Sequence, residues 1–511
     1  MSGVDGNKNF YAALADAMSR AGETVAFEEE NGTSTSYSVL RNDVGRMAAA
    51  LVALGLLPGD RVTAQVEKSR TNVLLYLATL QIGAVYNPLN TAYTAAELDY
   101  FIGDAKPTLL VVDPKFTETL ASVAAKHAVT AIETLDADGS GTLADRAAAT
   151  APLKEIATRS KDDLACLLYT SGTTGRSKGA MITHGNLSSN AETLHSHWRF
   201  QPGDVVLHAL PIYHVHGLFV CLHTALLNGS TMLWLPRFDL DAVIARLPRA
   251  TVMMGVPTFY TRLLSDERFD RELVAAMRLF VAGSAPLLAE THTDFEARTG
   301  HRILERYGMT EAGMITSNPY EPGGRIAGSV GYALPGVSVR IADDKGTALD
   351  AGEIGTLEVR GPNVCSGYWQ MPDKTAEEFR TDGFFITGDL ARADADGRIA
   401  IVGRAKDLII SGGFNVYPKE IESAIDDIPG IGESAVIGVP HPDFGEGVVA
   451  VITTRQADVS PDTVRAALAD QLARFKQPKK IFVVDELPRN TMGKVQKAAL
   501  RETYADLFSS A

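Results

Sequence analysis

Residues 169–179 read Tyr169-Thr170-Ser171-Gly172-Thr173-Thr174-Gly175-Arg176-Ser177-Lys178-Gly179. The apolar run Leu164–Leu168 precedes this segment and predicts a β-strand that leads into it. Its glycines let backbone N–H groups turn toward an anion, and its hydroxyls and Lys178 add donors suited to phosphate oxygens. It is not a Walker A loop, because Gly179 follows Lys178 and the glycine spacing differs. A polar surface turn is the alternative, but so many hydroxyls beside a lysine favour a phosphate-binding loop.

The composition is that of a soluble globular protein. The chain has 511 residues, too many for one hydrophobic core, so at least two domains are expected. Its net charge of −14 argues against a sequence-independent nucleic-acid binder, although it leaves room for a local basic pocket. Cys166, Cys221 and Cys365 lie far apart, which indicates neither a metal site nor a disulfide framework. The N-terminus lacks the apolar region of a secretory signal, so we expect a cytoplasmic protein without membrane or nucleic-acid partners.

The first part of the chain alternates helical and strand patterns. A helical repeat over 44–54 stops at Gly55, and a strand pattern follows at Arg61–Val66. Thr94 and Glu97 have the spacing of a capping box, and Thr108–Val112 has the apolar run of a buried parallel strand. Such alternation predicts an α/β architecture.

The pattern of predicted secondary structure changes further along the chain. Past about residue 325, strand-like runs such as Ser338–Ile341 and Thr356–Arg360 alternate with Gly, Pro and Asp turns. After Gly403, helical patterns at Glu420–Ile425 and Val464–Leu472 mix with strand patterns at 434–439 and 480–484. We therefore predict a large N-terminal domain of α/β layers with a β-rich subdomain, residues 1–403. A small mobile α+β domain, residues 404–511, would follow it.

Four further motifs follow the glycine-rich loop. They are Tyr307-Gly308-Met309-Thr310-Glu311, Ile386-Thr387-Gly388-Asp389, Gly403-Arg404-Ala405-Lys406-Asp407 and Pro488-Arg489-Asn490-Thr491-Met492-Gly493-Lys494. With these motifs in this order, the chain resembles the adenylate-forming enzymes over essentially its whole length. That superfamily includes acyl-CoA synthetases, luciferases and nonribosomal-peptide adenylation domains. The resemblance implies an acid–thiol ligase that uses ATP, Mg²⁺ and coenzyme A.

The resemblance also implies roles for particular residues. Glu311 would bind Mg²⁺, Thr310 would donate to phosphate, Asp389 and Arg404 would hold the ribose, and Tyr307 would stack on adenine. The residues expected to contact ATP or coenzyme A are Thr170, Ser171, Gly172, Thr173, Thr174, Gly175, Lys178, Ser284, Ala285, Pro286, Glu305, Arg306, Tyr307, Gly308, Met309, Asp389, Arg404 and Gly413.

The C-terminal motifs imply a moving catalytic lysine. Lys494 alone would be interpreted as a surface lysine. In the family the matching lysine bridges the carboxylate and the α-phosphate during adenylation, so Lys494, Thr310 and Glu311 are the expected catalytic residues. Lys406 matches the hinge about which the small domain swings to admit coenzyme A. A lysine that is exposed in one orientation could also be acetylated by a lysine acetyltransferase and restored by a deacetylase.

Three polar residues in the segments of the acyl pocket favour a short diacid. His216, Arg262 and Ser284 resemble the residues with which malonyl-CoA synthetases hold the distal carboxylate of malonate, and Met314 would cap the pocket. A core histidine, a helix-surface arginine and an adenine-loop donor remain the respective alternatives. His214, Arg237 and Arg278 lie near enough in sequence to compete for the role.

The sequence therefore predicts ligation of malonate, and secondarily methylmalonate, to coenzyme A through an acyl-adenylate. A ligase for another short-chain or aryl acid is the first alternative. A module that passes an acyl group to a carrier protein, or an ATP-binding regulatory protein without catalysis, belongs to other functional classes. We expect no appended carrier segment, which disfavours the first of these, and the presence of Lys494 disfavours the second.

Overall fold

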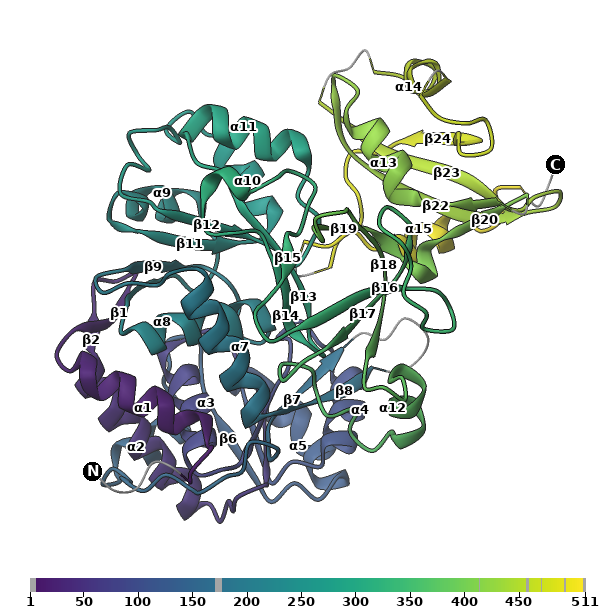
Figure 1. Ribbon diagram of the computed structural model, residues 1–511. Coiled ribbons are helices and arrows are strands. Elements are labelled where there is room, and N and C mark those ends of the chain that lie inside the picture. Colours follow the sequence, from purple (N-terminus) through teal and green to yellow (C-terminus); the bar gives the residue numbers. More distant parts are fainter. Residues whose placement is uncertain are drawn as a thin grey trace.

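The computed structural model describes residues 6–170, 177–412, 414–455, 459–469, 471–490 and 493–508. Most of this chain surrounds two β-sheets that share one hydrophobic core (Figure 1). The first sheet has the strand order β15 (Tyr332–Ala333), β14 (Gly313–Ser317), β13 (Leu304–Met309), β12 (Leu279–Ala282), β11 (Val252–Gly255), β9 (Val205–His208), β10 (Thr231–Trp234), β1 (Val25–Glu29), β2 (Ser34–Ser36). The second sheet has the order β6 (Ala131–Thr134), β5 (Leu109–Val112), β3 (Arg61–Gln65), β4 (Val85–Pro88), β7 (Leu164–Thr170), β8 (Lys178–Thr183). Both are mainly parallel, with antiparallel strands at their edges.

Helices cover the sheets in layers. The helices that contribute to the shared core are α1 (Phe10–Ala21), α2 (Tyr37–Ala53), α3 (Arg70–Gln81), α6 (Thr142–Ala148), α7 (His184–His197), α8 (His223–Asn228) and a π-helical segment, η2 (His216–Leu222). The outer face of the second sheet packs on α4 (Ala95–Ala105) and α5 (Thr117–Lys126). The outer face of the first sheet packs on α9 (Leu240–Arg246), α10 (Pro257–Leu264) and α11 (Ala289–Thr299).

Strand β5 shows why apolar runs form the middle of this architecture. All of its residues are buried. Leu109 and Val111 point into the shared core, whereas Leu110 and Val112 pack under α4 and α5. Side chains alternate between the two faces of a strand, so a strand covered on both faces must be apolar throughout. The expected capping box also forms at α4, where Thr94 and Glu97 satisfy each other's backbone N–H groups.

A third sheet follows the first two, with the order β16 (Ser338–Ala342), β17 (Gly355–Arg360), β18 (Phe385–Ala393), β19 (Ile399–Arg404), and α12 (Pro372–Glu378) lies beside it. Its strands are antiparallel, as the turn-rich sequence past residue 325 predicts. Short 3₁₀ turns complete the connections: η1 (Pro114–Phe116), η3 (Leu247–Arg249), η4 (Pro322–Gly324) and η5 (Ala405–Asp407).

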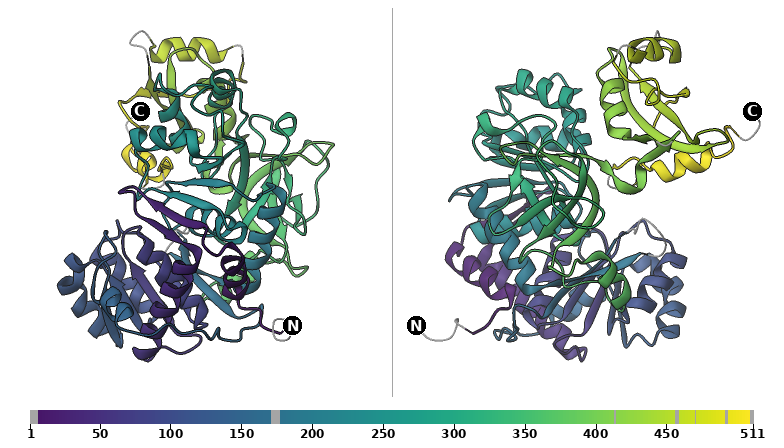
Figure 2. Two further views of the ribbon diagram at one scale, coloured as in Figure 1. Left: turned by 90° about the vertical axis from the view of Figure 1, so that its left-hand side faces the viewer. Right: turned by 45° about the vertical axis from the view of Figure 1, so that its right-hand side comes forward.

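Residues 409–508, called the C-terminal unit below, form a fourth sheet with helices on both faces (Figure 2). The elements are β20 (Ile409–Ser411), β21 (Phe414–Val416), α13 (Pro418–Asp426), β22 (Ile431–His441), β23 (Gly445–Thr454), α14 (Pro461–Ala469), β24 (Lys480–Val483) and α15 (Lys497–Thr503). One core lies under α13 and α14, and another lies under α15. The predicted fold class, α/β layers with a β-rich subdomain and a small α+β unit, is confirmed. The predicted boundary at 403/404 falls within β19, at the residue before its end, and stays a prediction.

No helix in the described ranges combines the length and the apolar character needed to cross a membrane.

Gly331 joins the first and third sheets at a point with no room for a side chain. It has φ +78°, and a Cβ added there would lie 2.0 Å from the carbonyl oxygen of Ser317. Its own carbonyl accepts the N–H of Ile399 at 2.7 Å. Gly331→Ala is expected to lower the apparent melting temperature by more than about 3 °C relative to Gly328→Ala. Gly328 has a similar φ of +74° but open space around it, so it controls for backbone strain alone. Equal melting temperatures for the two variants would refute the steric argument.

Candidate active site

The sequence motifs meet around one cavity of about 1430 Å³. Its walls come from the ends of β4, β7 and β13, from the third sheet and from the C-terminal unit. Ligands of open α/β sheets bind at the carboxyl ends of parallel strands, which is the edge exposed here. The predicted residues that line the cavity are Thr170, Lys178, His216, Ser284, Arg306, Gly308, Met309, Thr310, Glu311, Met314, Arg404, Lys406 and Lys494.

Other predicted residues lie outside the lining or outside the described residues. Ala285, Glu305, Tyr307 and Asp389 are next to lining residues in the chain, and Pro286, one residue further along, is exposed. Ser171, Gly172, Thr173, Thr174, Gly175 and Gly413 fall outside the described residues.

A cluster of two carboxylates and one lysine occupies the part of the cavity next to β8. The ammonium of Lys178 forms an ion pair of 2.5 Å with Glu378 and lies 4.2 Å from the ring centre of Tyr368. The Tyr368 hydroxyl lies 2.6 Å from Glu378 Oε2 and 3.2 Å from Glu311 Oε1. A phenol has one proton, so it donates to the nearer carboxylate and leaves Glu311 with the weaker contact. Tyr368 and Glu378 are site residues that no sequence pattern identified.

Glu311 is consequently a buried carboxylate without a cation of its own. It is 6% exposed and forms no ion pair with the described residues. Burial raises the pKa of its carboxyl group, while the charge of nearby Lys178 acts in the opposite direction. Such a group gains most from a cation that enters the cavity with a ligand.

Asp389 is held between two donors on the third sheet. Arg404 Nε lies 2.7 Å from Asp389 Oδ1 across the β18–β19 pair, and the Tyr307 hydroxyl donates to Asp389 Oδ2. Asp389 is only 3% exposed, whereas Arg404 reaches the cavity. Tyr307 packs in part against two apolar clusters of this region. The three side chains thus form one bonded group at the wall of the cavity.

Lys494 enters the cavity from the C-terminal unit. Its backbone N–H donates to Asn490 Oδ1 at 2.9 Å, and its carbonyl accepts the Asn490 N–H at 2.9 Å. This tight turn lies against the start of α10, since a Cβ added to Gly493 would be 3.3 Å from Thr258 Oγ1. The side chain is exposed to the open cavity, yet the surrounding walls desolvate it and, with Arg404, lower the pKa of its ammonium to about 8.

A second polar cluster lies at another part of the cavity. His216 is 1% exposed, and its Nδ1 lies 3.2 Å from the Ser284 hydroxyl. Ser284 adopts φ +72°, a conformation that non-glycine residues rarely adopt and that is typical of functional sites. Burial, followed by the charge of Arg306, lowers the pKa of His216 well below its usual range, so the ring is neutral. The Nε2 of this ring has no hydrogen-bond partner in the described chain.

Arg306 completes this second cluster. It is 3% exposed, it lines the cavity, and neither its Nε nor one of its terminal nitrogens has a partner among the described residues. Burial lowers the pKa of Arg306 to about 10, so the guanidinium remains charged at neutral pH. Its tip lies against Gly283, where an added Cβ would approach to 2.3 Å. The arrangement is a preformed cation, without an ion-pair partner in the described ranges, beside a neutral imidazole and a hydroxyl.

The structure does not bring Arg262 to this cluster. Its side chain is exposed on α10, with the guanidinium 6.0 Å from the ring centre of Phe238, and it does not line the cavity. The last turn of the Pro-started helix carries it to the surface, so the prediction that it binds a distal carboxylate is not supported. Arg306, which the family likeness placed around adenine, lines the cavity, and its charge acts on His216.

Of the other candidates for binding the distal carboxylate, one lines the cavity and two do not. Arg237 is exposed and lies outside the lining. Arg278 is bonded to Asp204 at the amino ends of β12 and β9, and it does not line the cavity. His214 does line the cavity, and burial lowers its pKa to about 4.

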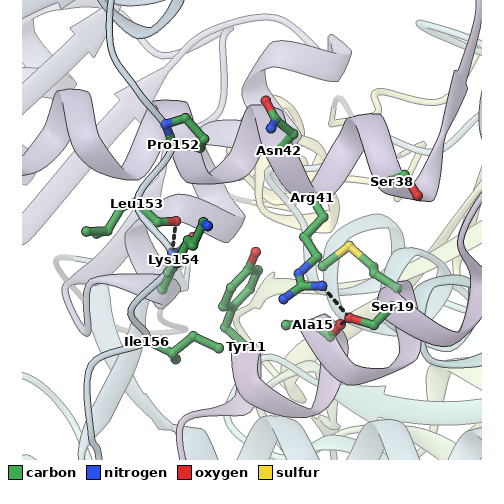
Figure 3. A pocket seen from close by; sticks show the side chains of 12 residues that line it. Tyr11, Ala15, Ser19, Ser38, Arg41, Asn42, Pro152, Leu153, Lys154 and Ile156 are labelled. Atoms are coloured by element: carbon green, nitrogen blue, oxygen red, sulfur yellow. Dashed lines mark hydrogen bonds between the residues drawn. The ribbon is translucent and has the colours of Figure 1, made fainter.

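A smaller cavity, of about 460 Å³, lies between α1, α2 and residues 152–156 (Figure 3). Tyr11 and Arg41 point toward it, and Arg41 donates to the Ser19 hydroxyl at 2.6 Å. Of the described residues that line it, none belongs to the sequence motifs. The described motif residues that line a cavity line the larger one.

Comparison with known proteins identifies the family. Residues 14–369 match the model of the AMP-binding enzyme family, and residues 420–494 match the AMP-binding enzyme C-terminal domain. Feruloyl-CoA synthase from Amycolatopsis sp is 37% identical, over 93% of this chain and 94% of its own length. Malonate–CoA ligase from Arabidopsis thaliana is 34% identical, over 97% of this chain and 88% of its own length.

Solved structures agree with this assignment. ATP-bound MatB from Rhodopseudomonas palustris is 56% identical and superposes with a TM-score of 0.96, over 98% of this chain and all of that chain. Apo MatB, at the same identity and coverage, gives a TM-score of 0.84. The chain therefore belongs to the AMP-binding enzyme family and is an acid–thiol ligase, an AMP-forming acyl-CoA synthetase with ATP and coenzyme A as co-substrates.

Proposed function

We propose that the acid is malonate, and that the enzyme converts malonate, ATP and coenzyme A into malonyl-CoA, AMP and pyrophosphate. The observation that carries this proposal is the unpaired guanidinium of Arg306 in the cavity wall. A buried cation without a partner is costly unless a ligand supplies the opposite charge. A short diacid supplies it with the carboxylate that does not react.

The neighbours of Arg306 complete a carboxylate site. A guanidinium offers two parallel N–H groups to a carboxylate, and a neutral imidazole and a hydroxyl can add hydrogen bonds to the same group. His216 and Ser284 occupy these positions. Met314, 2% exposed, lines the same cavity and would limit the size of a substituent on the α-carbon, so methylmalonate is proposed as a secondary substrate.

Adenylation requires the reacting carboxylate of malonate to attack the α-phosphorus of ATP. One oxygen–phosphorus bond forms and the bond to pyrophosphate breaks, which brings two anions together. Besides Arg306, the lysine and arginine side chains that line the cavity are Lys178, Arg404, Lys406 and Lys494, and Thr310 adds a hydroxyl. We assign Lys494 to the bridge between carboxylate and α-phosphate, because a flexible ammonium can follow the charge as it moves.

The residues present also fit Mg²⁺. This ion usually binds one or two protein carboxylates together with substrate phosphates, and Glu311 is a buried carboxylate without an ion pair in the described chain. Glu311 would hold the ion, which supplies charge neutralisation at the phosphates. Asp389, bonded by Arg404 and Tyr307, would present its carboxylate to the ribose hydroxyls.

The second step needs the thiol of coenzyme A to reach the adenylate. The sulfur attacks the acyl carbon, the bond to AMP breaks, and the thiol proton is released. Lys406 follows β19 and lies between the third sheet and the C-terminal unit, as a hinge must. The two MatB structures superpose on this chain to different extents, which supports more than one arrangement of the parts in this family. Acetylation of Lys494 stays a prediction.

An aryl acid remains the alternative substrate, because a feruloyl-CoA synthase is also similar to this chain. AMP release with coenzyme A across a panel of malonate, methylmalonate, propionate and ferulate distinguishes the two. Faster turnover of ferulate or propionate than of malonate would reject the malonate proposal.

The first test concerns Arg306. Arg306→Gln keeps hydrogen-bonding groups but removes the charge, and an unpaired buried carboxylate costs about 2–5 kcal/mol. The kcat/KM for malonate should fall at least about thirtyfold, and that for propionate far less. Arg262→Gln is the matched control, since that side chain is exposed; it should change both values less than about threefold. Equal losses for both acids in Arg306→Gln, or a selective loss in Arg262→Gln, would reject the assignment.

The second test concerns the protonation of Lys494, whose pKa is lowered to about 8 by desolvation and Arg404. The charged form is the active one, so kcat/KM for adenylation, measured by ATP–pyrophosphate exchange, should be maximal below pH 8 and fall as pH rises through it. In Lys494→Arg the side chain stays charged, so a slower reaction without this fall is expected. An alkaline fall that persists unchanged in Lys494→Arg would assign the titration to another group.

The third test concerns Glu311. Wild-type enzyme should bind ATP more tightly with Mg²⁺ than without it in calorimetric titrations. Glu311→Gln should reduce this difference about tenfold, because one anionic ligand is lost. Glu378→Gln provides the comparison, as Glu378 is paired with Lys178. If Glu378→Gln, and not Glu311→Gln, abolishes the preference for Mg²⁺, the metal assignment is wrong.

A further inference from the structure

Lys68 is a buried cation that the reaction does not use. It follows β3 and is 7% exposed. Its ammonium lies 2.8 Å from the carbonyl oxygen of His208, 2.6 Å from that of Leu235 and 3.0 Å from His208 Nδ1, and 4.0 Å from the ring centre of Trp234. Burial is the main influence on its pKa, which it lowers, and no carboxylate of the described residues contributes.

These contacts fix where the protons lie. An ammonium has three N–H donors, and the three contacts of Lys68 are acceptors if His208 Nδ1 carries a lone pair. The other ring nitrogen, Nε2, lies 3.0 Å from the carbonyl oxygen of Gly217 and must then carry the proton. The opposite tautomer would direct a lone pair at that carbonyl. Burial lowers the pKa of both groups. The acceptors around the ammonium and the Trp234 ring favour the charged form of Lys68, and that charge in turn disfavours a proton on His208 Nδ1.

Gly217 connects this pair to the acid site. It is the second residue of the π-helical segment η2, directly after His216. A Cβ at Gly217 would lie 2.0 Å from the carbonyl oxygen of Pro211, so the backbone is packed closely on that side. His208 holds the Gly217 carbonyl from another direction. π-Helical turns occur often at functional sites, and this one brings His216 into the cavity next to Ser284.

We propose that Lys68 is a positioning residue for acid recognition, which acts by fixing the Nε2–H tautomer of His208 and thereby the position of Gly217 and His216. The link to malonate rests on the function proposed above, but the link from Lys68 to the tautomer does not. Removal of the ammonium frees His208 to change tautomer, and the Gly217 carbonyl then loses its donor in part of the population.

The first measurement is ¹⁵N NMR of histidine-labelled enzyme without substrate. Assigned with the help of His208→Gln, the His208 signals should show one Nε2–H tautomer in wild type and a mixture of tautomers in Lys68→Met. Lys68→Met has similar length but removes a donor from the carbonyls of His208 and Leu235, so the melting temperature should fall by a few degrees while the variant stays folded. A single unchanged tautomer in a folded Lys68→Met variant overturns the proposal whatever the acid is.

The second measurement separates positioning from general stability. In Lys68→Met the KM for malonate should rise at least about fivefold, while the KM for ATP changes less than about twofold. His208→Gln, which retains an N–H donor for Gly217, should resemble wild type, and His208→Leu should resemble Lys68→Met. Combined with His208→Leu, Lys68→Met should add little further change, because both act through one bond.

The outcomes are distinguishable. A rise of both KM values by similar factors means that Lys68 only supports the core, which rejects the positioning role. If the substrate panel shows no use of malonate but the NMR result holds, the acid assignment fails while the Lys68–His208 link stands.

Discussion

Two negatively charged molecules have to meet in one cavity, and the energy of bringing them together must be offset by charges that are already in place. The chain is acidic overall, with a net charge of −14, yet lysine and arginine side chains converge on the cavity. They come from β8, β13, β19 and the C-terminal unit, which lie far apart in the sequence. Electrostatic stabilisation of this kind depends on preorganisation, so the sheets serve mainly to hold these cations at fixed positions.

Strand β13 shows how the sheet separates opposite charges onto its two faces. Glu305 and Arg306 are neighbours, and side chains of a strand alternate between its faces. Arg306 reaches the cavity, whereas Glu305 accepts the Leu287 N–H on the outer side, where burial raises the pKa of its carboxyl group to about 7. The backbone separates the two opposite charges, which would cancel if they faced each other. The guanidinium therefore stays available for a substrate.

Much of the fold was predictable because each local pattern had one physical solution. Apolar runs such as Leu109–Val112 can only be strands buried on both faces, and the capping box at Thr94 marks a helix start. The motifs also met in one cavity, as the family likeness implies. The site was harder to predict where the rotational position of a side chain on its helix, or a long-range tertiary contact, decides whether that side chain reaches the cavity. Arg262 fits an acid pocket by position in the sequence, but one helical turn carries it to the surface.

Other parts of the site had no signal in the sequence. Glu378 reaches the cavity because α12 lies beside the third sheet, and Lys68 has the appearance of an ordinary surface lysine until its carbonyl acceptors are known. His208, similarly, is one of 11 histidines and becomes distinctive only through its two ring contacts. Their roles depend on contacts with residues that are distant in the sequence, and these contacts depend on the whole fold.

The ammonium of Lys494 and part of the wall that closes the cavity belong to the same segment of the C-terminal unit, so access to the cavity and the position of this charge are coupled. Asn490, Lys494 and Gln496 are part of the cavity wall, and they belong to the same turn of the C-terminal unit. Any rotation of that unit that uncovers the cavity also withdraws the ammonium, because Lys494 and the wall move together. If Lys494 bridges the carboxylate and the α-phosphate as proposed, substrates therefore enter and products leave only while the adenylation site is incomplete. A stable mimic of the adenylate that bonds to Lys494 would fasten the two parts of the enzyme together, and its residence time would be set by the separation of those parts rather than by the strength of any one contact.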